Sequence, residues 1–269
     1  MDRERREWHG RAVEEWRRAW GVPTLRVYES VGSTNDIARG MAEDGAEQGS
    51  TVVADEQTRG RGRRGRVWRS DPGQSLILSM VARPRSLEAE SVLSIRLGLA
   101  VARAIEEIAP VAVGLKWPND LMIDGLKVGG MLCEGAVEGE RPAYVVAGTG
   151  VNVLQPDDAW TGALAGRATS LAARHGAAVS IPRLAGRVVQ EWLRVLDRRE
   201  GRLDPVELDA FRARDVLRGR RVTVDAEKRG VARGVEPDGA LRLAGDEGRS
   251  TRVVSGTVRV VEPDAGESI

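Results

Sequence analysis

The spacing of apolar residues predicts several helices in this chain of 269 residues. An apolar residue at every fourth position from Trp8 to Trp20, among charged side chains, predicts one amphipathic helix that Gly21 and Pro23 end. Ser33 begins a second, short helix as its N-cap. Helical spacing also continues over 87–108, the predicted core helix, and further helices are expected at about 168–175, 183–199 and 205–217.

The segments between these helices have the character of β-strands, with Asp124-Gly125 as a tight hairpin turn. Because the strands cluster rather than alternate with helices, we expect an α+β fold with a mixed, mainly antiparallel sheet flanked by helices. The predicted strands are 24–28, 51–57, 75–81, 111–117, 120–123, 127–136 and 143–153.

After Gly219 the pattern changes to short β segments, at 221–225, 230–236, 240–243 and 251–261, which predicts a small barrel. The chain therefore divides into an N-terminal amphipathic helix over 1–22, a main domain over 23–218, a barrel over 219–262 and a disordered tail over 263–269.

Composition excludes several classes of protein. A single cysteine rules out a disulfide framework or a thiolate zinc cluster, and two histidines make a transition-metal site or a Ser/His/Asp hydrolase a poor reading. The sequence has no apolar run near the roughly 20 residues that span a bilayer, which argues against a membrane protein. Its charged N-terminus does not resemble a secretory signal, so we expect a cytoplasmic protein.

The segment 59–66 carries five arginines and three glycines, including the pattern G-x-G-x-x-G. A dinucleotide-binding turn is disfavoured because no helix is predicted to follow it. Nucleic-acid binding is disfavoured because the rest of the chain carries a net charge of −4 and the pI is about 8.0. Glycines let a backbone close over a ligand and arginines bind carboxylates and phosphates in pairs, so we predict a clamp that orders around an anion.

Only three of the 41 basic residues are lysines. Two of them, Lys116 and Lys127, lie close in the sequence to the polar pair Asn119-Asp120. An exposed strand lysine is ordinarily a surface charge, but a sequence so biased to arginine weakens that alternative. A lysine against a substrate carboxylate and a reacting phosphate would neutralise repulsion between the two anions. Asp120 with Asn119 could place Mg²⁺ on a nucleotide, because that ion prefers oxygen ligands and phosphates.

Five short motifs, taken in order and spacing over about residues 24–260, resemble those of the biotin protein ligases. They are SerThrAsn at 33–35, Gln57 with GlyArgGlyArgArgGly at 60–65, LysTrpProAsnAsp at 116–120, LysValGlyGly at 127–130 and GlyThrGlyValAsn at 148–152. The resemblance implies a class II synthetase-like catalytic domain followed by an SH3-like barrel. It also implies that biotin and ATP, with Mg²⁺, form biotinyl-5′-adenylate, and that biotin then passes to a lysine of a biotin carboxyl carrier domain.

The resemblance assigns roles to individual residues. The catalytic residues would be Lys127, Arg63 and Asp120. Biotin would meet Ser33, Thr34, Asn35, Gln57, Arg61, Gly62, Arg63, Lys127, Gly129 and Gly130, with the two last glycines letting the backbone pass close to it. ATP and the adenylate would meet Arg61, Arg63, Arg66, Trp68, Lys116, Asn119 and Asn152, and the metal would meet Asp120 and Asn119.

Two alternatives differ from this reading. A lipoate–protein ligase would share the fold and the chemistry but need a channel for an aliphatic chain. A biotin-sensing or nucleic-acid-binding module would not be an enzyme. The family's larger members also carry an N-terminal DNA-binding domain, for which the residues ahead of the first strand are too few, so a dedicated ligase with no nucleic-acid partner is expected. The sequence leaves a homodimer open.

Overall fold

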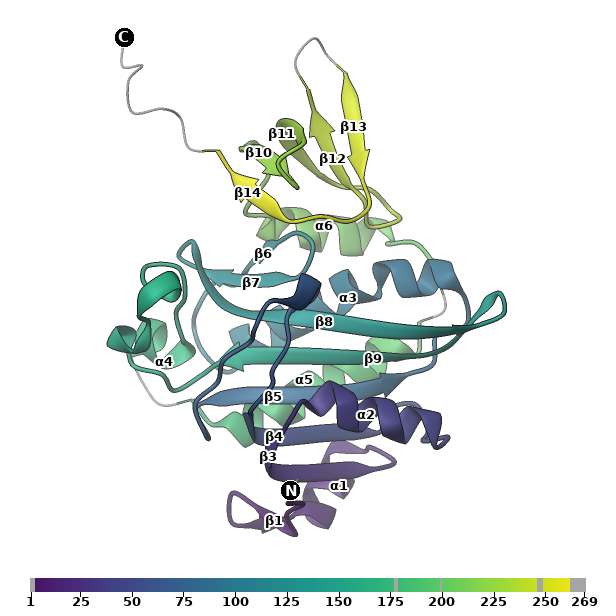
Figure 1. Cartoon of the computed structure of the whole chain (residues 1–269), viewed down its shortest axis with the longest axis vertical. Coiled ribbons are helices and arrows are strands. Elements are labelled where there is room, and N and C mark those ends of the chain that lie inside the picture. Colours follow the sequence, from purple (N-terminus) through teal and green to yellow (C-terminus); the bar gives the residue numbers. More distant parts are fainter. Residues whose placement is uncertain (1–2, 177–178, 199, 246–248, 262–269) are drawn as a thin grey trace.

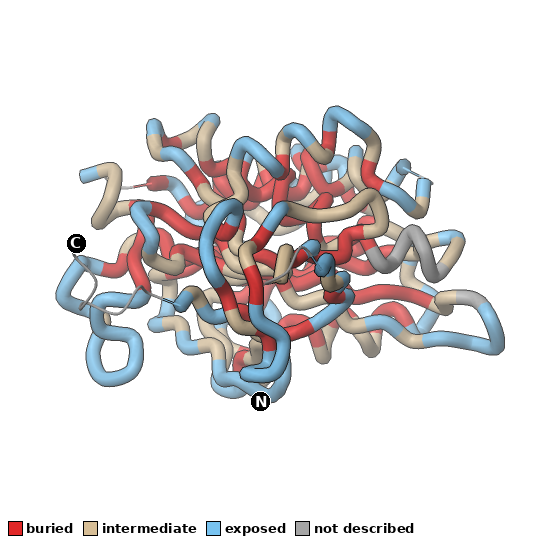
Figure 2. The backbone as a smooth tube through the Cα atoms, turned by 90° about the horizontal axis from the view of Figure 1, so that it is seen from above, coloured by how far each residue is buried: buried red, intermediate tan, exposed pale blue. Residues whose placement is uncertain are grey.

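The computed structural model describes residues 3–176, 179–198, 200–245 and 249–261. A seven-stranded sheet with helices on both faces forms the main body, and a smaller five-stranded sheet lies beyond one of its edges (Figure 1). Buried residues follow the strands and the helices packed on them, while exposed residues gather in the loops (Figure 2). The α+β class predicted from the sequence is confirmed.

The large sheet has the strand order β3-β4-β5-β9-β8-β7-β6. Only β3 and β4 pair in parallel, and every other pair is antiparallel, as predicted. Asp124 and Gly125 have positive φ angles of 49° and 77° and form the expected tight turn between β7 and β8. The strands are β3 (Leu25–Val31), β4 (Thr51–Gln57), β5 (Ser75–Ala82), β6 (Gly114–Lys116), β7 (Asp120–Ile123), β8 (Leu126–Glu138) and β9 (Arg141–Asn152).

Helices cover the two faces of this sheet unequally. Along β4, Val53 packs in the larger core with α3 (Leu87–Glu106) and α5 (Ile181–Leu196), whereas Val52 and Ala54 pack against α2 (Thr34–Glu43). Successive strand residues point to opposite faces, so α2 lies opposite α3 and α5. Two further helices are α4 (Leu171–His175) and α6 (Pro205–Arg214). Within the described ranges, every helix is too short or too polar to span a bilayer.

The N-terminal segment differs from the prediction. Residues 7–12 form a hairpin of β1 (Glu7–Trp8) and β2 (Arg11–Ala12), and the helix α1 covers only Val13–Trp20. His9 and Gly10 adopt left-handed φ angles of 47° and 73°, which make a two-residue turn and interrupt any helix. The hairpin still places Trp8 beside Trp16 and Trp20, with ring centroids 5.8–6.1 Å apart, so the four-residue spacing reflects real packing.

The C-terminal sheet has the order β13-β12-β11-β10-β14 and is antiparallel throughout. The single strand predicted over 251–261 is wrong. Residues 254–257 separate two strands, because β13 pairs with β12 at one edge while β14 pairs with β10 at the other. The strands are β10 (Arg221–Val224), β11 (Lys228–Val235), β12 (Leu241–Ala244), β13 (Ser250–Val253) and β14 (Val258–Val260). The domain boundaries stay a prediction, and the tail predicted over 263–269 lies outside the described residues.

Candidate active site

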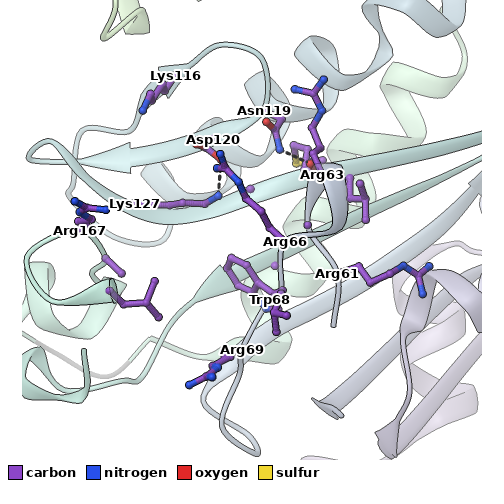
Figure 3. A pocket seen from close by; sticks show the side chains of 18 of the residues that line it. Arg61, Arg63, Arg66, Trp68, Arg69, Lys116, Asn119, Asp120, Lys127 and Arg167 are labelled. Carbon is purple, nitrogen blue, oxygen red and sulfur yellow. Dashed lines mark hydrogen bonds and ion pairs between the residues drawn. The ribbon is translucent and has the colours of Figure 1, made fainter. Parts of the chain in front are cut away.

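A cavity of about 1080 Å³ opens above the β7, β8 and β9 end of the large sheet. Its walls come from the start of α2, the loop after β4, residues 160–168 and residues 256–260 of the C-terminal sheet. Figure 3 shows the cationic side chains that converge on it. Every residue predicted for the site except Gly129 lines this cavity.

The floor of the cavity is main chain, because glycines face one another across two strands. Gly130 on β8 pairs with Gly150 on β9, and Gly148 lies opposite Leu132. A Cβ at Gly148 would lie 2.2 Å from Asn35 Oδ1, and one at Gly150 would lie 2.5 Å from the Trp68 ring. These positions therefore exclude any side chain.

Gly129 has a different role from the one predicted. It does not line the cavity, and a Cβ there would lie 2.6 Å from the carbonyl oxygen of Gly150. The glycine thus permits β8 and β9 to approach each other, whereas Gly130 is the one that faces the cavity.

One end of the cavity is polar and uncharged. The backbone N–H of Thr34 donates to Gln57 Oε1 at 2.8 Å, and the Thr34 hydroxyl lies 3.0 Å from the same oxygen. Asn35 Nδ2 donates to Glu134 Oε2 at 2.7 Å. Ser33 occupies the N-cap position of α2 and is buried beside them. The end of β4 and the start of α2 therefore bring the predicted residues 33–35 and 57 together.

The arginine–glycine loop closes on itself between β4 and β5. Gly62 N–H donates to the Arg66 carbonyl at 2.7 Å, and Trp68 N–H donates to the Gly60 carbonyl at 2.9 Å. A Cβ at Gly60 would lie 2.6 Å from the Trp68 carbonyl oxygen, so glycine is required where the two arms meet. The tip is the short 3₁₀ turn η1 (Arg63–Gly65).

The arginines of this loop divide between structural and cavity-facing roles. Arg61 binds Asp36 at 2.7 and 2.8 Å and Glu134 at 3.2 Å. These carboxylates raise the pKa of Arg61, and the Arg61 hydrogen bond is the main cause of a lowered pKa at Asp36. These ion pairs anchor the loop through Arg61, which also lines the cavity, so its predicted contact with an anionic ligand stays a prediction.

Arg63 is the loop's best-placed cation for a ligand. Burial is the first cause of a lowered pKa at Arg63, and its guanidinium makes no hydrogen bond or ion pair within the described part of the chain. Arg66 also points toward the cavity, beside Trp68 (Figure 3). A half-buried guanidinium without a hydrogen-bonded carboxylate favours binding of an anion.

The opposite end of the cavity is built from facing strands. Lys127 Nζ lies 2.5 Å from Asp120 Oδ1. Asp120 pairs with Lys116 on β6 and with Gly130 on β8, so the motifs 116–120 and 127–130 meet across β7. Burial is the main cause of a lowered pKa at Lys116. Asn119 Nδ2 donates to the Met131 carbonyl at 2.7 Å, which fixes the amide beside Asp120.

These oxygen ligands suit Mg²⁺ better than a transition metal. The described residues include no cluster of three or more His, Cys, Asp or Glu side chains able to hold a metal. Asp120 offers one carboxylate and Asn119 one amide, and Mg²⁺ is commonly held by one or two carboxylates together with substrate phosphates.

Parts of the wall were missed by sequence reasoning. Residues 160–168 flank Lys127: its N–H donates to the Arg167 carbonyl at 2.9 Å, and its own carbonyl accepts from Thr169 N–H at 2.9 Å. Asn152, which was predicted, is buried and donates to the Thr169 carbonyl at 2.9 Å. Arg167 and Arg259 also line the cavity. The sequence contains so many arginines that no local pattern distinguishes Arg167 and Arg259 from the others.

Comparison with known proteins gives a consistent assignment. Residues 27–152 match the model of the biotin/lipoate A/B protein ligase family. The bifunctional ligase/repressor BirA of Bacillus spizizenii is 33% identical over 82% of this chain and 70% of its own length. The biotin–[acetyl-CoA-carboxylase] ligase of Mycobacterium tuberculosis is 35% identical over 87% of this chain and 88% of its own length.

Solved structures agree. The biotin protein ligase of Aquifex aeolicus in complex with biotin and ATP superposes with a TM-score of 0.74, at 26% identity, over 90% of this chain and all of that one. The fold and the cavity thus define a ligase of the biotin/lipoate class. Within that class, the relatives at 33–35% identity place this chain in the biotin protein ligase family.

Proposed function

We propose that this enzyme joins biotin to ATP to give biotinyl-5′-adenylate and then transfers the biotin to a lysine of a carrier protein. The observation that carries the proposal is the polarity of the cavity. A neutral end at Thr34 and Gln57 suits the ureido ring of biotin, and a cationic end at Lys127 suits its carboxylate. The glycines at 130, 148 and 150 line the cavity between these two ends.

In the first step a carboxylate oxygen of biotin attacks the α-phosphorus of ATP. A new P–O bond forms, the bond from the α-phosphorus to the bridging oxygen breaks, and pyrophosphate leaves with the electron pair. Both partners are anions, so catalysis consists of positioning and charge neutralisation rather than proton transfer. Lys127 and Arg63 would supply that neutralisation, and Lys116 would bind the phosphates of ATP.

Mg²⁺, when bound with ATP, would be held by Asp120 and Asn119 and would screen the phosphate charges. The protein's own contribution is to fix these two side chains. The Asp120 carboxylate is held by Lys127 and the Asn119 amide by the Met131 carbonyl.

In the second step a lysine amine attacks the acyl carbon of the mixed anhydride. The new C–N bond forms, and the bond from the acyl carbon to the oxygen that bridges to phosphorus breaks. AMP leaves with that oxygen and the electron pair, and the amine loses a proton. We propose a biotin carboxyl carrier domain of a biotin-dependent carboxylase as the source of that lysine. The name of the Mycobacterium tuberculosis relative gives acetyl-CoA carboxylase as the protein to which that enzyme joins biotin. Action in the cytoplasm, the absence of a nucleic-acid partner and a possible homodimer stay predictions from the sequence.

The decisive experiment measures biotin-dependent exchange of labelled pyrophosphate into ATP, with lipoate as the competing acid. We expect exchange with biotin and little with lipoate, followed by ATP-dependent biotinylation of a purified carrier domain. Exchange with lipoate alone would replace biotin as the substrate. If neither acid supports exchange, the proposed function is wrong.

A further inference from the structure

The cavity carries more positive charge than its neighbouring carboxylates compensate. Within the described part of the chain, its lining includes nine cationic side chains and one carboxylate, that of Asp120. Three of the cations have carboxylate partners, namely Arg61 with Asp36 and Glu134, Arg64 with Asp225, and Lys127 with Asp120. The other six have no hydrogen-bonded or ion-paired carboxylate among the described residues. They are Arg63, Arg66, Arg69, Lys116, Arg167 and Arg259.

Unpaired cations are a local property of this cavity. Arginines elsewhere in the fold are commonly held by carboxylates, both inside the protein and on its surface. Examples are Arg96 with Glu207 at 2.8 Å, Arg198 with Asp204 at 2.6 Å and Arg214 with Glu106 at 2.5 Å. The surplus around the cavity therefore does not follow simply from the high arginine content of the chain.

The cavity is small enough for these charges to act on any group inside it. A volume of about 1080 Å³ corresponds to a cube with an edge of about 10 Å, which is close to the Debye length in 0.1 M salt. Burial is the first cause of a lowered pKa at Lys116. Asp120 opposes this effect, but the charges of Lys127 and Arg66 add to it. An amine at this end of the cavity is thus already repelled by its cationic neighbours.

The surplus persists into the second step of the proposed function, on which this inference rests. Pyrophosphate has then left, and the phosphate of biotinyl-5′-adenylate keeps one negative charge against the six unpaired cations. The acceptor lysine must reach the acyl carbon at the cationic end, beside Lys127. Like charges so close disfavour an ammonium group and favour the neutral amine.

The cavity offers the acceptor lysine no free base. Among the described residues that line it, Asp120 is the only carboxylate, and Lys127 already binds it at 2.5 Å. Both histidines lie elsewhere, His9 in the N-terminal hairpin and His175 at the end of α4. A neighbouring cation is an alternative means of activating a lysine nucleophile, because it favours the reactive amine.

We propose that the unpaired cations of the cavity expel a proton from the acceptor lysine as it enters, so that its amine attacks without a general base. The ammonium gives this proton to solvent. The nitrogen lone pair then forms the C–N bond, and the bond from the acyl carbon to the bridging oxygen breaks, with its electron pair leaving on AMP. The nitrogen gives a second proton to solvent as the amide forms.

The test follows the transfer step alone. Enzyme loaded with purified biotinyl-5′-adenylate is mixed with saturating carrier domain, and a single turnover is timed from about pH 6 to about pH 10. The rate should rise with pH and level off, with a midpoint about one to two pH units below the ordinary lysine pKa of about 10.4.

The informative variant combines Arg167→Gln with Arg259→Gln, which removes one cation from each of two walls. Its midpoint should move up by about half a pH unit, because less repulsion acts on the ammonium. Transfer should then be about threefold slower on the rising part of the profile and equal on the plateau. Impaired docking or folding would instead lower the rate at every pH.

Two matched variants separate charge from other effects. Arg167→Lys combined with Arg259→Lys keeps both charges and should keep the wild-type midpoint. Arg212→Gln removes an exposed arginine that pairs with Asp209 outside the cavity, and it should also leave the profile unchanged. Added salt should raise the wild-type midpoint, because screening weakens the repulsion.

The same midpoint in the wild-type enzyme and the glutamine variant would overturn the proposal. A transfer rate independent of pH over this range would also overturn it, since that is the behaviour of a carboxylate base. Either result would leave biotin transfer itself intact. A wild-type enzyme that passes no biotin from the adenylate to the carrier at any pH would contradict the proposed function instead.

Discussion

Arg64 at the tip of the arginine–glycine loop binds Asp225 in the turn between β10 and β11, 161 positions later in the chain. Arg64 Nη2 donates to Asp225 Oδ2 at 2.8 Å, and Nη1 binds the other carboxylate oxygen. Asp225 also accepts the Thr257 backbone N–H at 2.9 Å, so one carboxylate ties the loop to a segment that lines the cavity. The Arg64 hydrogen bond is the main cause of a lowered pKa at Asp225.

Breaking this tie should loosen the loop without removing a ligand contact of Arg63 or Arg66. We expect Arg64→Ala and Asp225→Ala each to raise the KM for ATP about two- to fivefold, because exposed ion pairs contribute little individually. The double variant should be no worse than Asp225→Ala alone, since that change already removes the Arg64 contact together with the Thr257 contact. Steady-state adenylation kinetics measure this, with the exposed pair of Arg212 and Asp209 as control. Additive effects of the two changes would contradict the coupling.

Lys127→Arg should abolish most of the first step. The guanidinium keeps the charge but cannot take the place of an ammonium held 2.5 Å from Asp120. Loss of one preorganised charge contact typically lowers the rate about a hundred- to a thousandfold, and we expect that drop in pyrophosphate exchange. The same substitution at Lys228, which is exposed in the C-terminal sheet, should have no effect. Near-normal activity of Lys127→Arg would show that Lys127 is only a surface charge with no specific role in the first step.

The loop over 59–66 should become resistant to trypsin when the adenylate forms. Arg64 and Arg66 are exposed, and only backbone hydrogen bonds and the Asp225 contact hold the tip. We expect cleavage in this segment without ligands and protection when biotin and ATP are both added, read by mass spectrometry. Identical cleavage in both conditions would disprove ordering by the ligand.

Lys116 should give the reaction an alkaline limit. Burial lowers the pKa of Lys116 from 10.5, so the ammonium loses its proton at a lower pH than a free lysine does. Activity that needs this cation is complete below the lowered pKa and falls as the pH rises through it. Replacement by arginine keeps the charge across this range, so the alkaline fall in kcat/KM for ATP should disappear. An unchanged pH profile in Lys116→Arg would show that the charge of Lys116 does not set the alkaline limit.

The N-terminal hairpin should be an integral part of the fold. Trp8 is almost fully buried and donates through Nε1 to Asp55 Oδ1 at 2.9 Å. Trp8→Ala should lower the free energy of unfolding by about 3–5 kcal/mol, the usual range for a buried aromatic residue. Trp8→Phe keeps most of the ring contact and should lose less. Denaturant titration followed by circular dichroism separates the two, and equal, small losses would show that the segment contributes little.

Local sequence patterns predicted the positions of the strands and helices better than they predicted where one element ends and which element it packs against. The strand 51–57 was predicted to the residue, and its residues Val52, Val53 and Ala54 are buried on both faces of the sheet. The first helix was extended wrongly because tryptophans four apart fit both a helix and a hairpin folded against it. The last strand was merged because its two halves are separated only by their partners at opposite edges of the sheet.

The site was predictable where its residues form short contiguous sequence motifs, as at 33–35 and 116–120. It was not predictable where a role depends on a distant partner. The ion pair of Arg61 with Asp36, 25 positions earlier in the sequence, could not be predicted from the arginine–glycine motif. Ser79 lies in an apolar strand with no motif, and its contact with Asn35 spans 44 positions.

Two glycines of β9 in the cavity floor limit how this enzyme can evolve. Most binding pockets change their preference by exchanging one floor residue for another of different size. Here any exchange at Gly148 or Gly150 would place its first carbon within 2.5 Å of a neighbouring side chain. A change in the acid that the enzyme accepts is therefore expected from residues of the rim, on α2 and the loops, rather than from these two floor positions.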